Sequence, residues 1–266
     1  MPEQSGQFQS AESTMKKQLT IFALLCIFSC SNEAVEEPEE IGPKGTFLLH
    51  LHAYVGIQEV DLYGIEYETP EGRSMSLDFS QMYISDVQLV KADGSVYAIK
   101  GKSFLKNLKV HTYEIGQVPV GNYKSIRFKV GLPPSINSLN PTAPSDSSML
   151  NRPSMWWGNT AQPGGYVFLN VQGKIDTSHN MNKAPVPFVY KIGTNDHFIQ
   201  VNMGEKEFSI EEEAYVYGHL IVDYSKLFNG ITLNQAGSLS VKTAAENNAA
   251  LGQKIANNIP AMFTYE

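Results

Sequence analysis

Apolar and polar residues alternate along much of the chain after Thr46. In residues 47–55 the odd-numbered positions are apolar: Phe47, Leu49, Leu51, Ala53 and Val55. Neighbouring side chains of a β-strand point to opposite faces, so these five would share one face and His50, His52 and Tyr54 the other. The alternation predicts half-buried strands rather than amphipathic helices.

Similar segments follow at intervals, most of them separated by Gly- and Asn/Asp-rich turns. Residues 82–90 form a second expected strand, and the turn Ala92-Asp93-Gly94-Ser95 leads into a third at 96–99. Further strands are expected at 107–114, 123–131, 165–173, 186–192, 197–203 and 214–224. A helical pattern occurs at about 246–257, and the connections 133–153 and 176–187 lack strand character. We therefore predict an all-β protein, an antiparallel Greek-key β-sandwich with one short C-terminal helix.

Composition excludes several classes of function. With 42% hydrophobic and 18% charged residues the chain can bury a sizeable core. A net charge of −7 leaves no basic surface to neutralise phosphates, which argues against a nucleic-acid partner. The two cysteines, Cys26 and Cys30, both precede the expected strands, so we expect neither a disulfide nor a thiolate metal site in the folded part.

Residues 15–30 have the three parts of a bacterial export signal. Lys16 and Lys17 provide a positive start, about ten largely apolar residues follow, and Ser29 precedes Cys30. The apolar run is too short to span a bilayer of about 30 Å. Residues 27–30 (IFSC) resemble a lipobox, in which Cys30 would be lipidated and anchor the protein to a membrane. The alternative is a secretory peptide with an incidental cysteine.

These patterns divide the chain into four segments. Residues 1–14 are expected to be an upstream extension, because Met15 suits the true start. Residues 15–30 are the signal peptide, 31–45 an acidic tether, and 46–266 the β-sandwich domain. The acidic run after Cys30 resembles the surface-export signal of Bacteroidota lipoproteins, so we expect attachment at the outer membrane, on either face.

Several segments, in this order, resemble the MbnP-like family of copper-binding proteins. They are the His-containing strand 47–56 and the segments 82–89 (MYISDVQL), 118–131 (VPVGNYKSIRFKVG), 155–157 (MWW), 165–173 (GYVFLNVQG), 188–194 (FVYKIGT) and 220–228 (LIVDYSKLF). The resemblance implies a β-sandwich, a copper site that includes His52, and a di-haem MauG-type peroxidase as a possible partner. Considered by themselves, most of these segments have structural explanations, such as tight turns and core strands.

The spacing of His50 and His52 also permits metal binding. Residues i and i+2 of a strand project from one face with Cα atoms roughly 6.6 Å apart, and imidazole suits copper and zinc. A third donor would have to come from His197 or Met155. The resemblance also implies a histidine where this chain has Lys191, a cation that would repel a metal. The alternative is that His50 and His52 are partly exposed strand residues hydrogen-bonded to their neighbours.

Trp156 and Trp157 are the other candidates, either as an oxidation site or as docking aromatics. The interpretation that we favour is that both tryptophans cap the end of the sandwich core.

The sequence contains none of the common catalytic motifs that we sought, namely Gly-x-Ser-x-Gly, His-Glu-x-x-His and phosphate-binding glycine loops, so we do not expect an enzyme. Two functions remain: a copper-binding lipoprotein of the cell envelope, or a surface interaction module whose metal site has degenerated.

Overall fold

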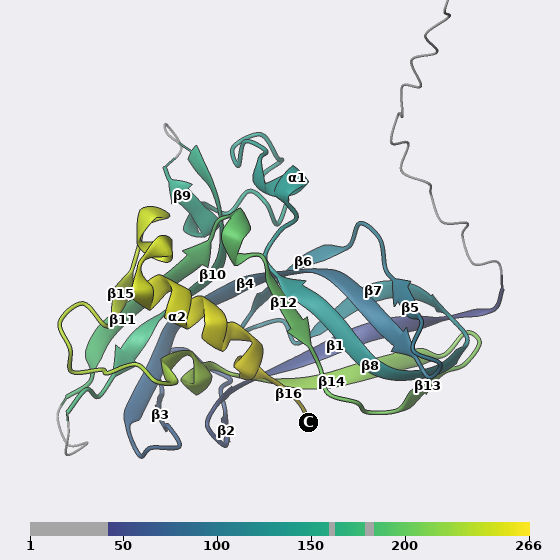
Figure 1. Ribbon diagram of the computed structural model, residues 1–266, viewed down its shortest axis with the longest axis horizontal. Helices are drawn as coiled ribbons and strands as arrows, with labels where there is room; N and C mark the ends of the chain where they lie inside the picture. Colours follow the sequence, from purple (N-terminus) through teal and green to yellow (C-terminus); the bar gives the residue numbers. More distant parts are fainter. Residues whose placement is uncertain (1–41, 160–162, 179–183) are drawn as a thin grey trace, which may run out of the picture. The chain divides into compact units, whose positions relative to one another are not determined.

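The computed structural model describes residues 42–159, 163–178 and 184–266. Its strands form two sheets, and the all-β class is confirmed (Figure 1). The strands of the first sheet are β1 (Lys44–Val55), β2 (Gln58–Glu59), β7 (Thr112–Pro119), β14 (Tyr215–Asp223) and β16 (Phe263–Tyr265). The strands of the second sheet are β3 (Glu66–Glu68), β4 (Ser74–Lys91), β5 (Val96–Ala98), β6 (Ser103–Asn107), β8 (Gly121–Val130), β10 (Pro163–Ile175), β11 (Val186–Gly193), β12 (Ile199–Asn202), β13 (Phe208–Ile210) and β15 (Ser240–Val241), with β9 (Trp156–Gly158) paired to β10.

Strand β1 lies in the middle of the first sheet. On one side it pairs with β14 from Thr46 to Tyr54, and this pairing is parallel. It also pairs antiparallel with β7 along residues 44–50 and with β2 at residues 54–55. Most pairings in the protein are antiparallel, as expected, but this parallel pair joins the first long strand to the last one.

The expected alternation of β1 is present. Its inward side chains are fully buried between the sheets: Phe47, Leu49, Leu51, Ala53 and Val55. They pack in one core with side chains of the second sheet, such as Ile84 of β4, Phe128 of β8 and Val171 of β10. Burying a side chain of this size contributes about 1.5–3 kcal/mol, so the register of β1 is strongly fixed, and with it the outward direction of the even-numbered residues.

A second, smaller core explains why β4 is buried on both of its faces. Met82 and Ile84 face the main core, whereas Tyr83 belongs to a separate cluster with Trp156, Tyr166 and other apolar residues. This cluster is covered by the long connection after β8, which contains α1 (Pro134–Asn137) and the 3₁₀ turn η1 (Pro153–Met155). The expectation that residues 133–153 contain no strand is correct.

The expected strand at 107–114 is wrong in its boundaries. Strand β6 ends at Asn107 and β7 begins at Thr112. The Asn107 side-chain oxygen accepts hydrogen bonds from the backbone N–H groups of Lys109 and Val110, at 2.8 and 2.9 Å. This asparagine turn reverses the chain, although Leu108 and Val110 continue the apolar alternation in the sequence.

The C-terminal helix is confirmed but starts later than expected. Helix α2 covers Ala250–Asn258 and is preceded by the 3₁₀ turn η4 (Ala245–Asn248). Ile255 and Ala256 pack on the main core, and the Asn258 side chain donates hydrogen bonds to the backbone oxygens of Leu227 and Asn229, in and directly after the 3₁₀ turn η3 (Tyr224–Phe228). The remaining 3₁₀ turns are η2 (Asn195–His197) and η5 (Ile259–Met262), and η5 leads into β16.

Gly173 is needed where β10 crosses a register shift against β4. A Cβ atom at this position would lie 2.0 Å from the backbone oxygen of Ser76. The obstacle is backbone rather than a flexible side chain, so the strands could accept a larger residue only by moving apart.

Candidate metal centre

The outer face of the first sheet brings together histidines from both ends of the chain. His50 and His52 lie on β1, and the parallel register places His219 of β14 directly beside His50. Leu49, Leu51 and Leu220 point into the core, so the three imidazoles must project outward. His50 and His52 are half-buried and His219 is exposed.

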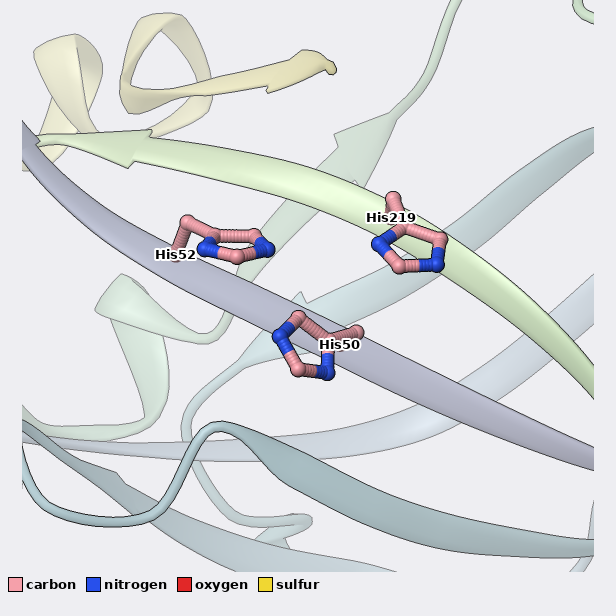
Figure 2. A group of neighbouring side chains, drawn as sticks. All are labelled: His50, His52 and His219. Carbon is pink, nitrogen blue, oxygen red and sulfur yellow. The ribbon is translucent and has the colours of Figure 1, made fainter. Parts of the chain in front are cut away.

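The three rings are close enough to share one metal ion. The ring centroid of His50 lies 4.3 Å from that of His52 and 5.1 Å from that of His219. The centroids of His52 and His219 are 6.2 Å apart. One nitrogen from each ring lies within 4.8 Å of the others (Figure 2). Imidazole nitrogens are good donors for copper and zinc, so this donor set fits either metal.

Hydrogen bonds orient the two rings of β1. His52 Nδ1 donates to Glu59 Oε1 at 2.6 Å, which orients the ring and leaves Nε2 as the nitrogen that can bind a metal. His50 Nδ1 is hydrogen-bonded to Thr112 Oγ1 at 2.7 Å. With Thr112 as the acceptor, Nε2 of His50 is likewise free to bind a metal. Glu59 comes from β2 and Thr112 from β7, so both strands that flank β1 on this side contribute to the orientation.

The surroundings favour the neutral form of His50. Burial lowers the pKa of His50, and the neighbouring His52, His219 and His111 lower it further. The Glu266 carboxylate raises this pKa and opposes part of the effect. Because only neutral imidazole binds a metal, a lowered pKa keeps His50 in its ligating form at neutral pH.

Glu266 and His111 complete the surroundings of the three rings. Glu266 Oε2 lies 3.5 Å from His52 Nε2 and 3.3 Å from His219 Nδ1. The ring centroid of His111 lies 6.2 Å from that of His50 and 6.3 Å from that of His52. His111 is held beside β1 by its backbone oxygen, which accepts a hydrogen bond from Leu51 N at 2.8 Å.

The structure places the expected third donors elsewhere. His197 is buried in η2, where its Nδ1 lies 3.1 Å from Thr194 Oγ1, and Met155 is buried in the smaller core. His219 stands beside His50 and His52 instead, a neighbour that the sequence analysis did not select. Lys191 lies on β11 of the second sheet, so its positive charge is not on the sheet that carries the three histidines.

Trp156 and Trp157 are both almost fully buried, at 4% and 6% exposure. Trp156 packs in the smaller core and its Nε1 donates to the backbone oxygen of Leu150 at 3.1 Å. The Trp157 ring lies against Gly193. A Cβ atom added at Gly193 would lie only 3.1 Å from Nε1 of Trp157. These contacts favour the packing role over surface docking.

Cys30, the export signal and most of the acidic tether lie outside the described residues. Within the described part, none of the helices is long and apolar enough to cross a membrane.

Comparison with known proteins agrees with this geometry. The family model described as MbnP matches residues 44–245. Among solved structures, the fold is similar to that of MbnP from Methylosinus trichosporium, with a TM-score of 0.50 and 14% sequence identity, covering 76% of this chain and 84% of that one. At this identity the similarity concerns the fold alone. A search of curated protein sequences found no significant match. The family and the histidine cluster together fit a role in metal handling.

Proposed function

The chain belongs to the MbnP family, and on that basis we propose that it is a cell-envelope lipoprotein that binds copper through His50, His52 and His219. The observation that supports this most strongly is the gathering of three imidazoles, with donor nitrogens within 4.8 Å of one another, on one sheet face. Copper forms the most stable complexes with nitrogen donors among the divalent first-row metals, so such a site prefers it whenever it is available.

The orientation of the rings also supports metal binding. A histidine that ligates a metal usually donates its other N–H to a carboxylate or carbonyl, and the contact between His52 and Glu59 has this form. An interaction module with a degenerate site has no need for three converging imidazoles. The third histidine therefore favours the copper-binding hypothesis over that alternative.

The test of this proposal is the His219→Ala variant. We expect its copper dissociation constant to rise roughly 100-fold or more, since loss of even a residue that only hydrogen-bonds to a ligand costs about 10–100-fold. His111→Ala is the matched control, because His111 lies on the same surface but outside the group of three. Competition with a chromophoric chelator measures both affinities. Equal copper affinity in His219→Ala and the parent would contradict the proposed site.

The envelope location is proposed from residues 15–30 and the lipobox-like IFSC sequence. We expect Cys30→Ser to abolish incorporation of radiolabelled palmitate in a bacterial host and to release the protein from the washed membrane fraction. A Cys26→Ser variant is the control, because Cys26 lies within the apolar run. Membrane attachment of Cys30→Ser at the level of the parent would rule out this anchor.

The proposed role is to bind and hand on the metal rather than to catalyse a reaction. A di-haem peroxidase partner, which the family resemblance implies, stays a prediction.

A further inference from the structure

We propose that Glu266 supplies the fourth ligand of the metal centre and so makes it a site for a divalent ion, Cu²⁺ or Zn²⁺, in preference to Cu⁺. This inference rests on the proposed metal-binding function. It concerns a residue outside the three-histidine group and the charge of the ion that the site holds.

The first argument is geometric. Donors bound at about 2.0–2.2 Å to a tetrahedral ion lie roughly 3.3–3.5 Å from one another. Glu266 Oε2 lies 3.5 Å from His52 Nε2 and 3.3 Å from His219 Nδ1, so it already has this separation from two of the three imidazoles. His52 Nε2 is also the ring nitrogen that does not contact Glu59. The carboxylate oxygen therefore lies beside one ring nitrogen of each of these two histidines.

The second argument is the positioning of Glu266. Its backbone N–H donates to the His219 backbone oxygen at 3.2 Å, and its own backbone oxygen accepts from Lys206 Nζ at 2.9 Å. Lys206 also lies over the ring of Tyr265, with Nζ 5.3 Å from the centroid. Because these hydrogen bonds hold its backbone, placing Glu266 beside the histidines costs less conformational entropy than it would on an unrestrained backbone.

The third argument is charge. An imidazole that ligates a metal is neutral and adds no charge, whereas Glu266 and Glu59 each add one negative charge within hydrogen-bond or ion-pair distance of the rings. A divalent ion would bring the centre to neutrality, and Cu⁺ would leave it negative in a half-buried position. A carboxylate oxygen is moreover a harder donor than imidazole or sulfur, which disfavours the soft ion Cu⁺.

The experiment compares the full-length parent protein with Glu266→Gln and Asp78→Asn. Both variants remove one negative charge, but Asp78 is exposed on β4 of the second sheet, whereas the three histidines lie on the first. Affinities for Cu²⁺, Zn²⁺ and anaerobically held Cu⁺ are measured by chelator competition, and the Cu²⁺ sites are compared by electron paramagnetic resonance. The backbone contacts of Glu266 are retained in Glu266→Gln, and its melting temperature without metal checks the fold.

We expect Glu266→Gln to weaken Cu²⁺ and Zn²⁺ binding at least tenfold, to change the Cu²⁺ hyperfine splitting, and to leave Cu⁺ affinity within about threefold of the parent. Asp78→Asn should leave the Cu²⁺ spectrum close to that of the parent. An unchanged spectrum in Glu266→Gln, or equal losses for Cu⁺ and Cu²⁺, would overturn the fourth ligand while leaving the histidine site intact. If the parent itself binds none of the three ions, both this inference and the proposed function fail.

Discussion

Replacing both His50 and His52 by alanine is expected to abolish specific copper binding. The double variant retains His219 as the last of the three imidazoles, and a single imidazole beside one carboxylate cannot compete with a chelator for copper. We expect the dissociation constant to rise by roughly three orders of magnitude or more. Loss of one residue that only hydrogen-bonds to a ligand typically raises it about 10–100-fold.

Thermal unfolding gives an independent measure of the same change. A ligand at 100 times its dissociation constant stabilises the folded state by about 2.7 kcal/mol. For a domain of about 220 residues this corresponds to a rise in melting temperature of roughly 5–10 °C in the parent. The double variant should show no rise.

The fold should survive this double substitution. His50 and His52 are only half-buried, and the side chains that fix β1 in the core are its odd-numbered residues. The metal-free melting temperature should therefore stay within a few degrees of the parent. His111→Ala should behave like the parent in both measurements. A copper-induced rise of equal size in the double variant would show that copper binds elsewhere on the chain.

Lys106→Met is expected to stabilise the protein by about 2 kcal/mol at pH 7. Lys106 lies on β6 with its side chain fully buried, and its Nζ donates to the backbone oxygen of Asn107 at 2.7 Å. None of the carboxylates among the described residues lies within salt-bridge distance of this ammonium group. Burial lowers the pKa of Lys106 from 10.5 to about 8.

The size of the effect follows from this pKa. Each tenfold loss of proton affinity corresponds to about 1.4 kcal/mol, so burying the charge costs the folded state about 3 kcal/mol. Methionine removes that cost but leaves the Asn107 oxygen without this donor, which costs about 1 kcal/mol. Urea unfolding at pH 7 measures the difference. Lys109→Met is the matched control, because Lys109 is exposed in the following turn and should change stability by less than about 0.5 kcal/mol.

The effect should also depend on pH. Below about pH 8 Lys106 is protonated in both states, and the full cost applies. Between pH 8 and 10.5 the unfolded chain retains the proton and the folded protein loses it, so the parent gains stability as pH rises. The advantage of Lys106→Met should therefore shrink between pH 8 and 10.5. An advantage that grows with pH, or a destabilised variant at pH 7, would contradict this account of Lys106.

The strands of the core could be predicted because their burial pattern is local. In β1 every second residue is apolar and buried, so the sequence places His50 and His52 on the opposite face without any knowledge of the neighbouring strands. The asparagine turn after β6 escaped prediction because it depends on one side chain bonding to the backbone, while the apolar pattern continues through Leu108 and Val110.

The third histidine could not be found in this way. His219 is an outward residue of an expected strand, but its partner strand is 169 positions earlier in the sequence and runs parallel to it. An antiparallel meander would have placed other strands beside β1. The same long-range pairing brings Glu266 to the site, because β16 pairs with β14.

The central claim, that the outer face of the first sheet holds copper through three imidazoles, is tested most directly on the parent protein. One equivalent of Cu²⁺ is added, the bound metal is counted per chain, and pulsed electron paramagnetic resonance counts the coordinated imidazoles. We predict one tightly bound copper per chain with three imidazole nitrogens. Copper that stays in solution, or that binds with no imidazole nitrogen, would contradict the account.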